Sequence, residues 1–122
     1  MTTAIDIPDD SDFTLANLPF GVGRRAGWEP RVFVALGDHA LDLHSLASHV
    51  DPGVPAHVFC RSDLNAFLAL GPQAWRSVRE CVTSYAVGET HPDVVVPRAE
   101  LDMLRPVTVG DYVDMYAGLH HA

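Results

Sequence analysis

The chain has 122 residues, of which 48% are hydrophobic and 20% charged, a composition typical of one folded globular domain and unlike that of a disordered chain. Sixteen acidic residues oppose eight basic ones, and all eight are arginine, so a nucleic-acid partner, which needs Lys and Arg to neutralise phosphates, is not expected. No apolar run approaches the roughly 20 residues of a membrane-spanning helix, and no signal peptide is recognisable, so we expect a cytoplasmic protein without a membrane partner.

The first predicted elements are extended. Residues 1–12 are polar and acidic and predict a flexible lead-in, which places the ordered domain at 13–122. The stretch FTLANLPFGVG mixes apolar residues with Pro19, Gly21 and Gly23, which favours an extended segment lying on a core. RVFVAL (31–36) and HALDL (39–43) then flank a Gly-Asp pair, and this pattern predicts a β-hairpin.

Helices are expected in the middle of the chain. A short helical turn fits residues 44–50, before the prolines and glycine of 52–55. A helix capped by Ser62 or Asp63 is predicted by apolar residues at helical spacing and ends at Gly71. A second helix begins at Pro72 and completes a helical hairpin, with the core face Trp75, Val78, Val82 and Tyr85.

The chain becomes extended again after Gly88. Strands are predicted in DVVVP (93–97), in ELDML (100–104) and in VTV (107–109), with Pro97 and Pro106 at strand ends. The order of strands, two helices and strands predicts a β-rich α+β fold, a small barrel or sheet with a helical insertion.

The stretch GDYVDMYAGLHHA (110–122) carries the candidate functional residues. If Tyr112 to Tyr116 form a strand, Asp114 and Tyr116 lie on one face, and a turn at Ala117–Gly118 could bring His120 or His121 back toward Asp114. A carboxylate can bind a hard divalent cation, a phenol can donate a hydrogen bond to a substrate oxygen, and an imidazole can act as a general base.

The same residues also have a structural interpretation, which spacing alone favours. Asp is common in turns, tyrosines at strand spacing often pack, and a histidine pair is often solvated. A cation site would also be incomplete here, since Ca²⁺ takes roughly 6 to 8 oxygen ligands and Mg²⁺ an octahedron, whereas Asp114 supplies one or two.

Four stretches in order resemble the N-terminal domain of the fumarylacetoacetase (fumarylacetoacetate hydrolase) family: SDFTLANLPFGVG, VFVALGDHALDL, LNAFLALGPQAW and RPVTVGDYVDMYAGLHHA. The resemblance runs from Ser11 to Ala122. It implies a small, partly open SH3-like barrel that precedes a larger catalytic domain, absent from this sequence, in a homodimeric enzyme of tyrosine and phenylalanine catabolism.

The resemblance also implies roles for single residues. Asp114 matches the family's metal-ligand aspartate for Ca²⁺ or Mg²⁺, Tyr116 its substrate-binding tyrosine and His121 its catalytic histidine. The expected reaction cleaves a C–C bond of a diketo acid, fumarylacetoacetate, to give fumarate and acetoacetate. This chain alone is expected to be inactive.

One departure from the family pattern supports an alternative. Where the family commonly has Tyr-Ser-Ser-Arg, this chain has Tyr116, Ala117, Gly118 and Leu119, which removes polar groups close to the expected site. The alternative is a stand-alone, non-catalytic interaction or regulatory module. We favour the enzyme segment because Asp114, Tyr116 and His121 are retained together at the family spacing.

The remaining cysteines and histidines predict no further site. Cys60 and Cys81 are far apart and are expected to be reduced, partly buried thiols. The spacing of His39, His44, His49 and His57 does not fit zinc, so these side chains are expected to be structural or exposed.

Overall fold

The computed structural model of the chain describes residues 5–108. Its strands are β1 (Phe20–Arg24), β2 (Arg31–Leu36), β3 (His39–Asp42), β4 (Val95–Pro97) and β5 (Asp102–Leu104). Its helices are α1 (Leu43–Leu46), α2 (Asn65–Leu68) and α3 (Pro72–Val87), with 3-10 turns η1 (Ala56–Phe59) and η2 (Arg98–Glu100). The fold is therefore α+β, as the sequence predicts. No helix among the described residues is long and apolar enough to cross a membrane.

The strands form one antiparallel sheet in the order β4-β3-β2-β1-β5. The predicted hairpin is confirmed: β2 and β3 pair with Leu36 opposite His39, and Gly37 adopts the positive φ of 60° that the turn requires. The described strands are not closed into a barrel, because β4 and β5 stand at the two ends of the order. The prediction of an SH3-like barrel is therefore not confirmed.

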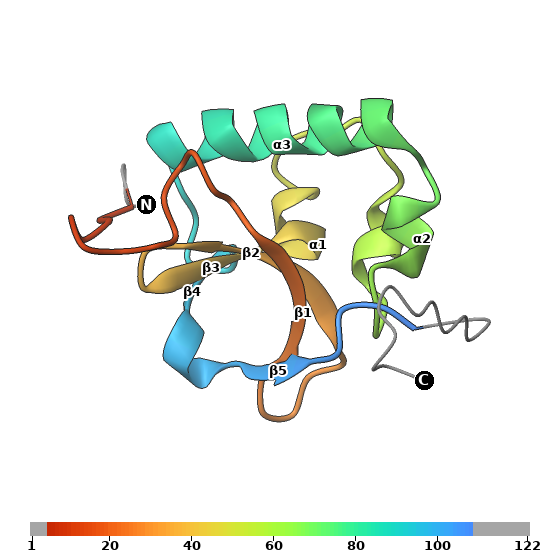
Figure 1. The fold of residues 1–122 in the computed structure, drawn as a ribbon, viewed down its shortest axis with the longest axis horizontal. Coiled ribbons are helices and arrows are strands. Elements are labelled where there is room, and N and C mark those ends of the chain that lie inside the picture. The colour runs from red at the N-terminus through yellow and green to blue at the C-terminus, as the bar shows by residue number, and fades with distance from the viewer. Residues whose placement is uncertain (1–4, 109–122) are drawn as a thin grey trace, which may run out of the picture.

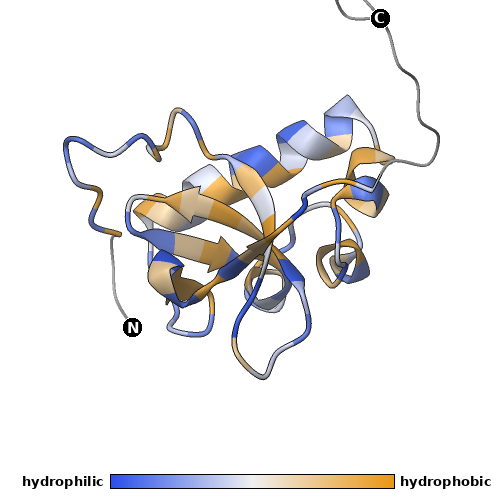
Figure 2. Cartoon of the chain, turned by 60° about the horizontal axis from the view of Figure 1, so that its bottom comes forward, coloured by the Kyte–Doolittle hydropathy of each residue, from blue (hydrophilic) through white to orange (hydrophobic). Residues whose placement is uncertain are grey.

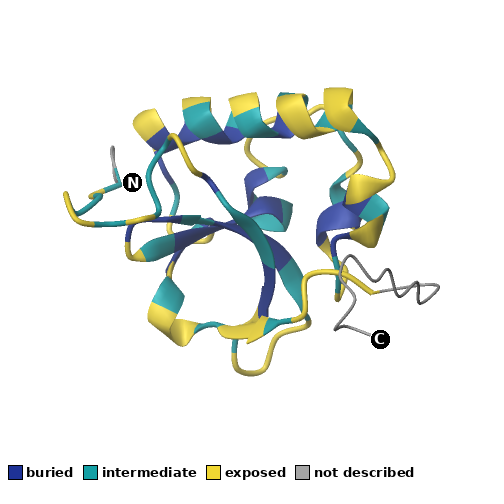
Figure 3. Cartoon of the chain, viewed as in Figure 1, coloured by how far each residue is buried: buried dark blue, intermediate teal, exposed yellow. Residues whose placement is uncertain are grey.

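The helices all lie on one side of the sheet, with α3 outermost and α1 between α3 and the strands (Figure 1). We call this side of the sheet the inner face. Its core combines strand residues such as Val22 and Leu41 with Phe59 of η1 and Val82 of α3, all fully buried. Figure 3 shows the buried residues of α3 on its sheet side and exposed ones on the opposite side. This burial of one apolar helix face on a sheet is the main source of stability.

Two expectations about the helices need correction. The helix predicted from Ser62 or Asp63 to Gly71 is a single turn, Asn65–Leu68. It ends there because the N–H groups of Leu70 and Gly71 donate to the carbonyls three residues earlier, in a tighter turn. The predicted helical hairpin is therefore not found in that form. On α3, the core positions Val78, Val82 and Tyr85 are buried as predicted, but Trp75 is 38% exposed. Its indole N–H donates to the Phe67 carbonyl, so Trp75 connects the two helices at the surface.

Only the last part of the first predicted extended stretch is a strand: β1 begins at Phe20, whereas residues 15–17 form a turn. β1 lies between β2 and β5 and pairs with both. A Cβ at Gly21 would lie 3.1 Å from Met103 Cε. The turn before β1 is held from α3, where the Arg79 guanidinium donates to the carbonyls of Ala16 and Asn17 at 2.8 and 3.3 Å. Of the predicted strand VTV, Val107 and Thr108 are in irregular structure, and position 109 lies outside the described residues.

Candidate functional site

The three residues predicted to do chemistry, Asp114, Tyr116 and His121, lie outside the described residues. The structure follows the chain to Thr108, six positions before Asp114. What it shows is how the segment leading to the predicted site is attached to the folded domain.

That attachment is a network of hydrogen bonds at the start of α2, formed by Asp63, Asn65 and Thr108, which we call the exit anchor. Asn65 binds both backbone groups of Thr108, donating from Nδ2 to its carbonyl at 2.7 Å and accepting its N–H at Oδ1 at 3.0 Å. The Thr108 hydroxyl donates to Asp63 Oδ2 at 2.6 Å. One step earlier, the Leu64 N–H donates to the Pro106 carbonyl at 2.7 Å.

The Asn65 side chain can bind the Thr108 backbone because an amide group forms the same pair of hydrogen bonds as the backbone of a neighbouring strand. Asn65 offers one donor and one acceptor side by side, which is the pattern that a neighbouring strand would present to Thr108. Asp63 holds Asn65 in place by accepting its backbone N–H at 3.0 Å. The hydrogen bond from Thr108, followed by that from the Asn65 backbone, lowers the pKa of Asp63 below its ordinary value of 3.8.

Sequence reasoning assigned Asp63 to a different role. It was a predicted helix cap, but α2 begins after Leu64 and has no side-chain cap. The Asp-x-Asn spacing is the usual signal of a local turn, and nothing local in the sequence shows that its partner is Thr108, 43 positions from Asn65.

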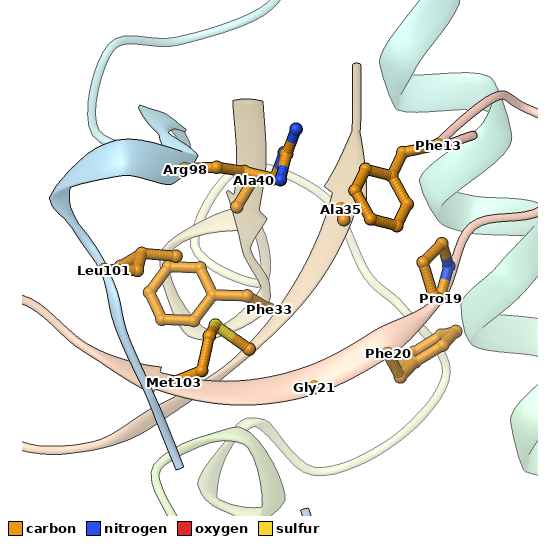
Figure 4. Close-up of a pocket in the computed structure, with 10 residues that line it drawn as sticks. All are labelled: Phe13, Pro19, Phe20, Gly21, Phe33, Ala35, Ala40, Arg98, Leu101 and Met103. Atoms are coloured by element: carbon orange, nitrogen blue, oxygen red, sulfur yellow. The ribbon is translucent and has the colours of Figure 1, made fainter. Parts of the chain in front are cut away.

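A pocket of about 240 Å³ lies on the outer face of the sheet, opposite the helices. Apolar side chains form most of its lining. Figure 4 shows Phe33, Leu101 and Met103 along one side, Phe13, Pro19 and Phe20 along the other, and Arg98 reaching between them. The sequence contained no signal for this pocket, because its lining comes from distant stretches.

A second polar cluster joins α3 to the chain before β4. The rings of His49 and His91 stack with centroids 3.7 Å apart, and His49 Nε2 lies 3.0 Å from Asp93 Oδ2. The Tyr85 hydroxyl lies 2.9 Å from His91 Nδ1 and accepts the His91 backbone N–H at 2.7 Å. Burial raises the pKa of Tyr85. These contacts connect elements of the fold, in agreement with the structural role predicted for His49.

The described residues contain no group of three or more His, Cys, Asp or Glu that could hold a metal ion. Asp114, the predicted cation ligand, lies outside them. Both cysteines are free: Cys60 is exposed, which corrects the expectation that it is partly buried, and Cys81 is half-buried. Burial, followed by the nearby Asp51 charge, raises the pKa of Cys81, which makes it a poor nucleophile.

Comparisons with known proteins identify similar chains. The family model described as the fumarylacetoacetase N-terminal region matches residues 16–106. The fumarylacetoacetase of Emericella nidulans is 38% identical, with an alignment that covers 100% of this chain and 33% of the relative. The fumarylacetoacetase of Caenorhabditis elegans is 34% identical over 100% of this chain and 32% of the relative. The fumarylacetoacetase of Homo sapiens is 36% identical, with an alignment that covers 97% of this chain and 31% of the human protein.

The chain therefore spans about a third of the length of the curated relatives that it matches. The family match ends at residue 106, two positions before Thr108 of the exit anchor. The alignment with the Emericella nidulans protein covers the whole chain and so includes the positions of the predicted site residues.

Proposed function

Because the chain belongs to the fumarylacetoacetase N-terminal family, we propose that it forms the N-terminal part of a hydrolase that cleaves a C–C bond of fumarylacetoacetate to give fumarate and acetoacetate. The observation that carries the proposal is the family match over residues 16–106, together with alignment of the whole chain to curated fumarylacetoacetases. The domain at 13–122 would act with the two thirds of the relatives' length that this chain does not span.

In this proposal the chain contributes three side chains to the active site. His121 acts as the general base that takes a proton from a water molecule, and the resulting hydroxide attacks a carbonyl carbon of the diketo acid. Tyr116 donates a hydrogen bond to a substrate oxygen and so fixes its orientation. Asp114 provides a carboxylate for a divalent cation. The C–C bond then breaks, and the acetoacetate carbanion is protonated as it leaves.

A Ca²⁺ or Mg²⁺ ion would supply charge stabilisation to the substrate oxygens as negative charge develops. Asp114 is a suitable ligand because both cations prefer oxygen donors, and a carboxylate offers one or two of them. The other ligands, and a glutamate that orients His121, would have to come from the part of the relatives that this chain does not span.

The exit anchor supports a positioning role for the folded domain. Thr108 is bound through its N–H, its carbonyl and its hydroxyl, so the point from which the segment with Asp114 departs is fixed against α2. Because Thr108 is fixed, less conformational entropy must be lost when the catalytic side chains that follow it are positioned in the active site.

Three further features belong to the proposal. The complete protein would be a cytoplasmic homodimer, and its reaction would be a step in tyrosine and phenylalanine catabolism. The α+β unit would correspond to the partly open SH3-like barrel of the family, and its antiparallel five-stranded sheet supports this correspondence.

The test joins this chain in frame to the C-terminal two thirds of the Emericella nidulans fumarylacetoacetase and measures hydrolysis of fumarylacetoacetate. We expect the fusion to turn over substrate and the 122-residue chain alone to show no hydrolysis. His121→Ala in the fusion should lower kcat by at least about 100-fold, the scale of general-base catalysis. His120→Ala is the matched control and should change kcat less than about threefold.

Two outcomes would contradict the proposal. One is hydrolysis by the 122-residue chain alone. The other is a fusion that is folded by circular dichroism and of the expected size, yet inactive or insensitive to His121→Ala.

A further inference from the structure

We propose that the outer-face pocket is a binding site for a small carboxylic acid with an apolar body, such as a short acid that carries a single ring. The pocket is formed entirely by residues between Phe13 and Met103, so the inference stands independently of the proposed function.

The hollow exists because small residues occupy neighbouring strands. Gly21 of β1, Ala35 of β2 and Ala40 of β3 all line it, and Ala35 pairs directly with Ala40 in the sheet. Alternation along the strands puts larger side chains, such as Val34 and Leu41, into the inner-face core instead. The small side chains leave space above the sheet where Leu or Val would fill it.

The walls around this floor are apolar and come from separate stretches. Phe13, Pro19 and Phe20 precede β2, Phe33 stands on β2, and Leu101 and Met103 come from the chain around β5. The volume of about 240 Å³ exceeds the roughly 150 Å³ that accepts benzene in an engineered cavity and is below the roughly 300 Å³ at which sites for drug-sized ligands begin. A single ring with a short side arm therefore fits.

Among the described residues that line the pocket, Arg98 alone carries a charge. Its Nε donates to the Gly37 carbonyl at 2.8 Å, and its guanidinium lies 4.4 Å from the centre of the Phe13 ring. These contacts hold the group at the pocket and leave guanidinium N–H donors for a ligand, because arginine has five. A carboxylate is the natural partner of such a fork.

Acidic neighbours of Arg98 oppose an anion, but none of them lines the pocket itself. Asp10, Asp12 and Asp38 line an adjoining shallow hollow that shares Arg98 and Phe13 with the pocket. Asp38 is 74% exposed and lies 3.7 Å from Nη2, and an exposed ion pair at that separation contributes little. A bound carboxylate can therefore replace this contact.

The shape favours a small molecule over a protein side chain. A docking surface for another protein is usually broad, whereas this pocket is concave. One side is formed by Phe33, Leu101 and Met103, and the other by Phe13, Pro19 and Phe20. Met103 is 65% exposed, and its flexible side chain can adjust to the ligand.

The experiment titrates the ¹⁵N-labelled 122-residue chain with 3-phenylpropanoate and, separately, with its neutral amide, and follows the backbone amides by NMR. We expect saturable shifts centred on Gly21, Ala35 and Ala40 with the acid. The amide should bind about tenfold to 100-fold more weakly, the effect of losing a hydrogen bond between charged groups. This comparison between ligands does not depend on any variant folding.

Two variants locate the site. Arg98→Gln should weaken binding of the acid by about tenfold and leave that of the amide unchanged, whereas Arg76→Gln, on the exposed side of α3, should change neither. Ala35→Leu, which fills the hollow, should abolish both titrations, and Ala26→Leu, in the exposed turn before β2, is its matched control.

Three results would overturn the proposal. The first is equal affinity for the acid and the amide, which would indicate a purely apolar pocket for a protein side chain. The second is saturable shifts elsewhere in the domain, and the third is no saturable shift with either compound.

Discussion

The two faces of the sheet differ in what their side chains do. On the inner face, apolar residues from all three helices and from β1, β2 and β3 form one continuous buried core. On the outer face, among the residues that the structure describes, the buried cluster is limited to Phe33, Ala40 and Val96, with Leu101 against it and a pocket beside it. Figure 2 shows that the strands are nevertheless largely hydrophobic in colour. The inner face therefore supplies most of the stability, and the outer face has room for a ligand.

The largest expected change in the free energy of unfolding comes from comparing two phenylalanines, one on each face of the sheet. Phe59→Ala removes a fully buried ring from the inner core and should lower the free energy of unfolding by about 4 kcal/mol. Phe33→Ala should cost at least about 1 kcal/mol less, because Phe33 borders the pocket and leaves no sealed cavity behind. Urea unfolding of both variants measures the difference, and equal losses would remove the distinction between the faces.

A second contrast concerns two aspartates at opposite ends of β3. Asp42 is 3% exposed, caps α1 through the N–H groups of His44 and Ser45, and pairs with Arg31 at 2.7 Å. Asp42→Ala should lower the free energy of unfolding by about 3 kcal/mol, because it leaves the Arg31 charge without its partner. Asp38→Ala, in the exposed turn, should change it by less than about 0.5 kcal/mol. Similar losses in thermal or urea unfolding would contradict this account.

The smallest expected change in stability comes from the exit anchor, and it depends on pH. Because the folded state lowers the pKa of Asp63, the hydrogen bond with Thr108 stabilises the fold above the ordinary value of 3.8. That contribution is lost as the pH falls through the lowered pKa. Thr108→Val should therefore lower Tm by a few degrees at most at neutral pH, and by less at an acidic pH below 3.8.

The control for the anchor is Thr83→Val. The Thr83 hydroxyl donates to the Arg79 carbonyl within α3 and has no titratable partner in that bond. Its effect on Tm should be the same at both pH values. If the two threonine variants depend on pH in the same way, Asp63 does not hold Thr108 as described.

Local sequence signals predicted the elements that local physics determines. The β2–β3 hairpin follows from the Gly37–Asp38 turn, and the position of α3 follows from Pro72 and from the spacing of Val78, Val82 and Tyr85. The class, α+β, follows from the order of these elements.

Features that depend on distant contacts were not predictable in this way. The glycines of β1 favoured an extended segment lying on the core, and nothing local shows that β5 pairs with β1 and brings Met103 Cε within 3.1 Å of a Cβ at Gly21. Asp63 indicated a helix cap, but its main partner is Thr108. The predicted site residues came from the terminal motif and the family resemblance, and they stay a prediction because they lie outside the described residues.

The most direct test of the central claim is to sequence the source DNA beyond the codon for Ala122. We predict an open reading frame that continues into the region matching the other two thirds of the fumarylacetoacetases, with acidic residues to complete the cation site. A stop codon directly after Ala122 would contradict the claim and would favour a stand-alone module.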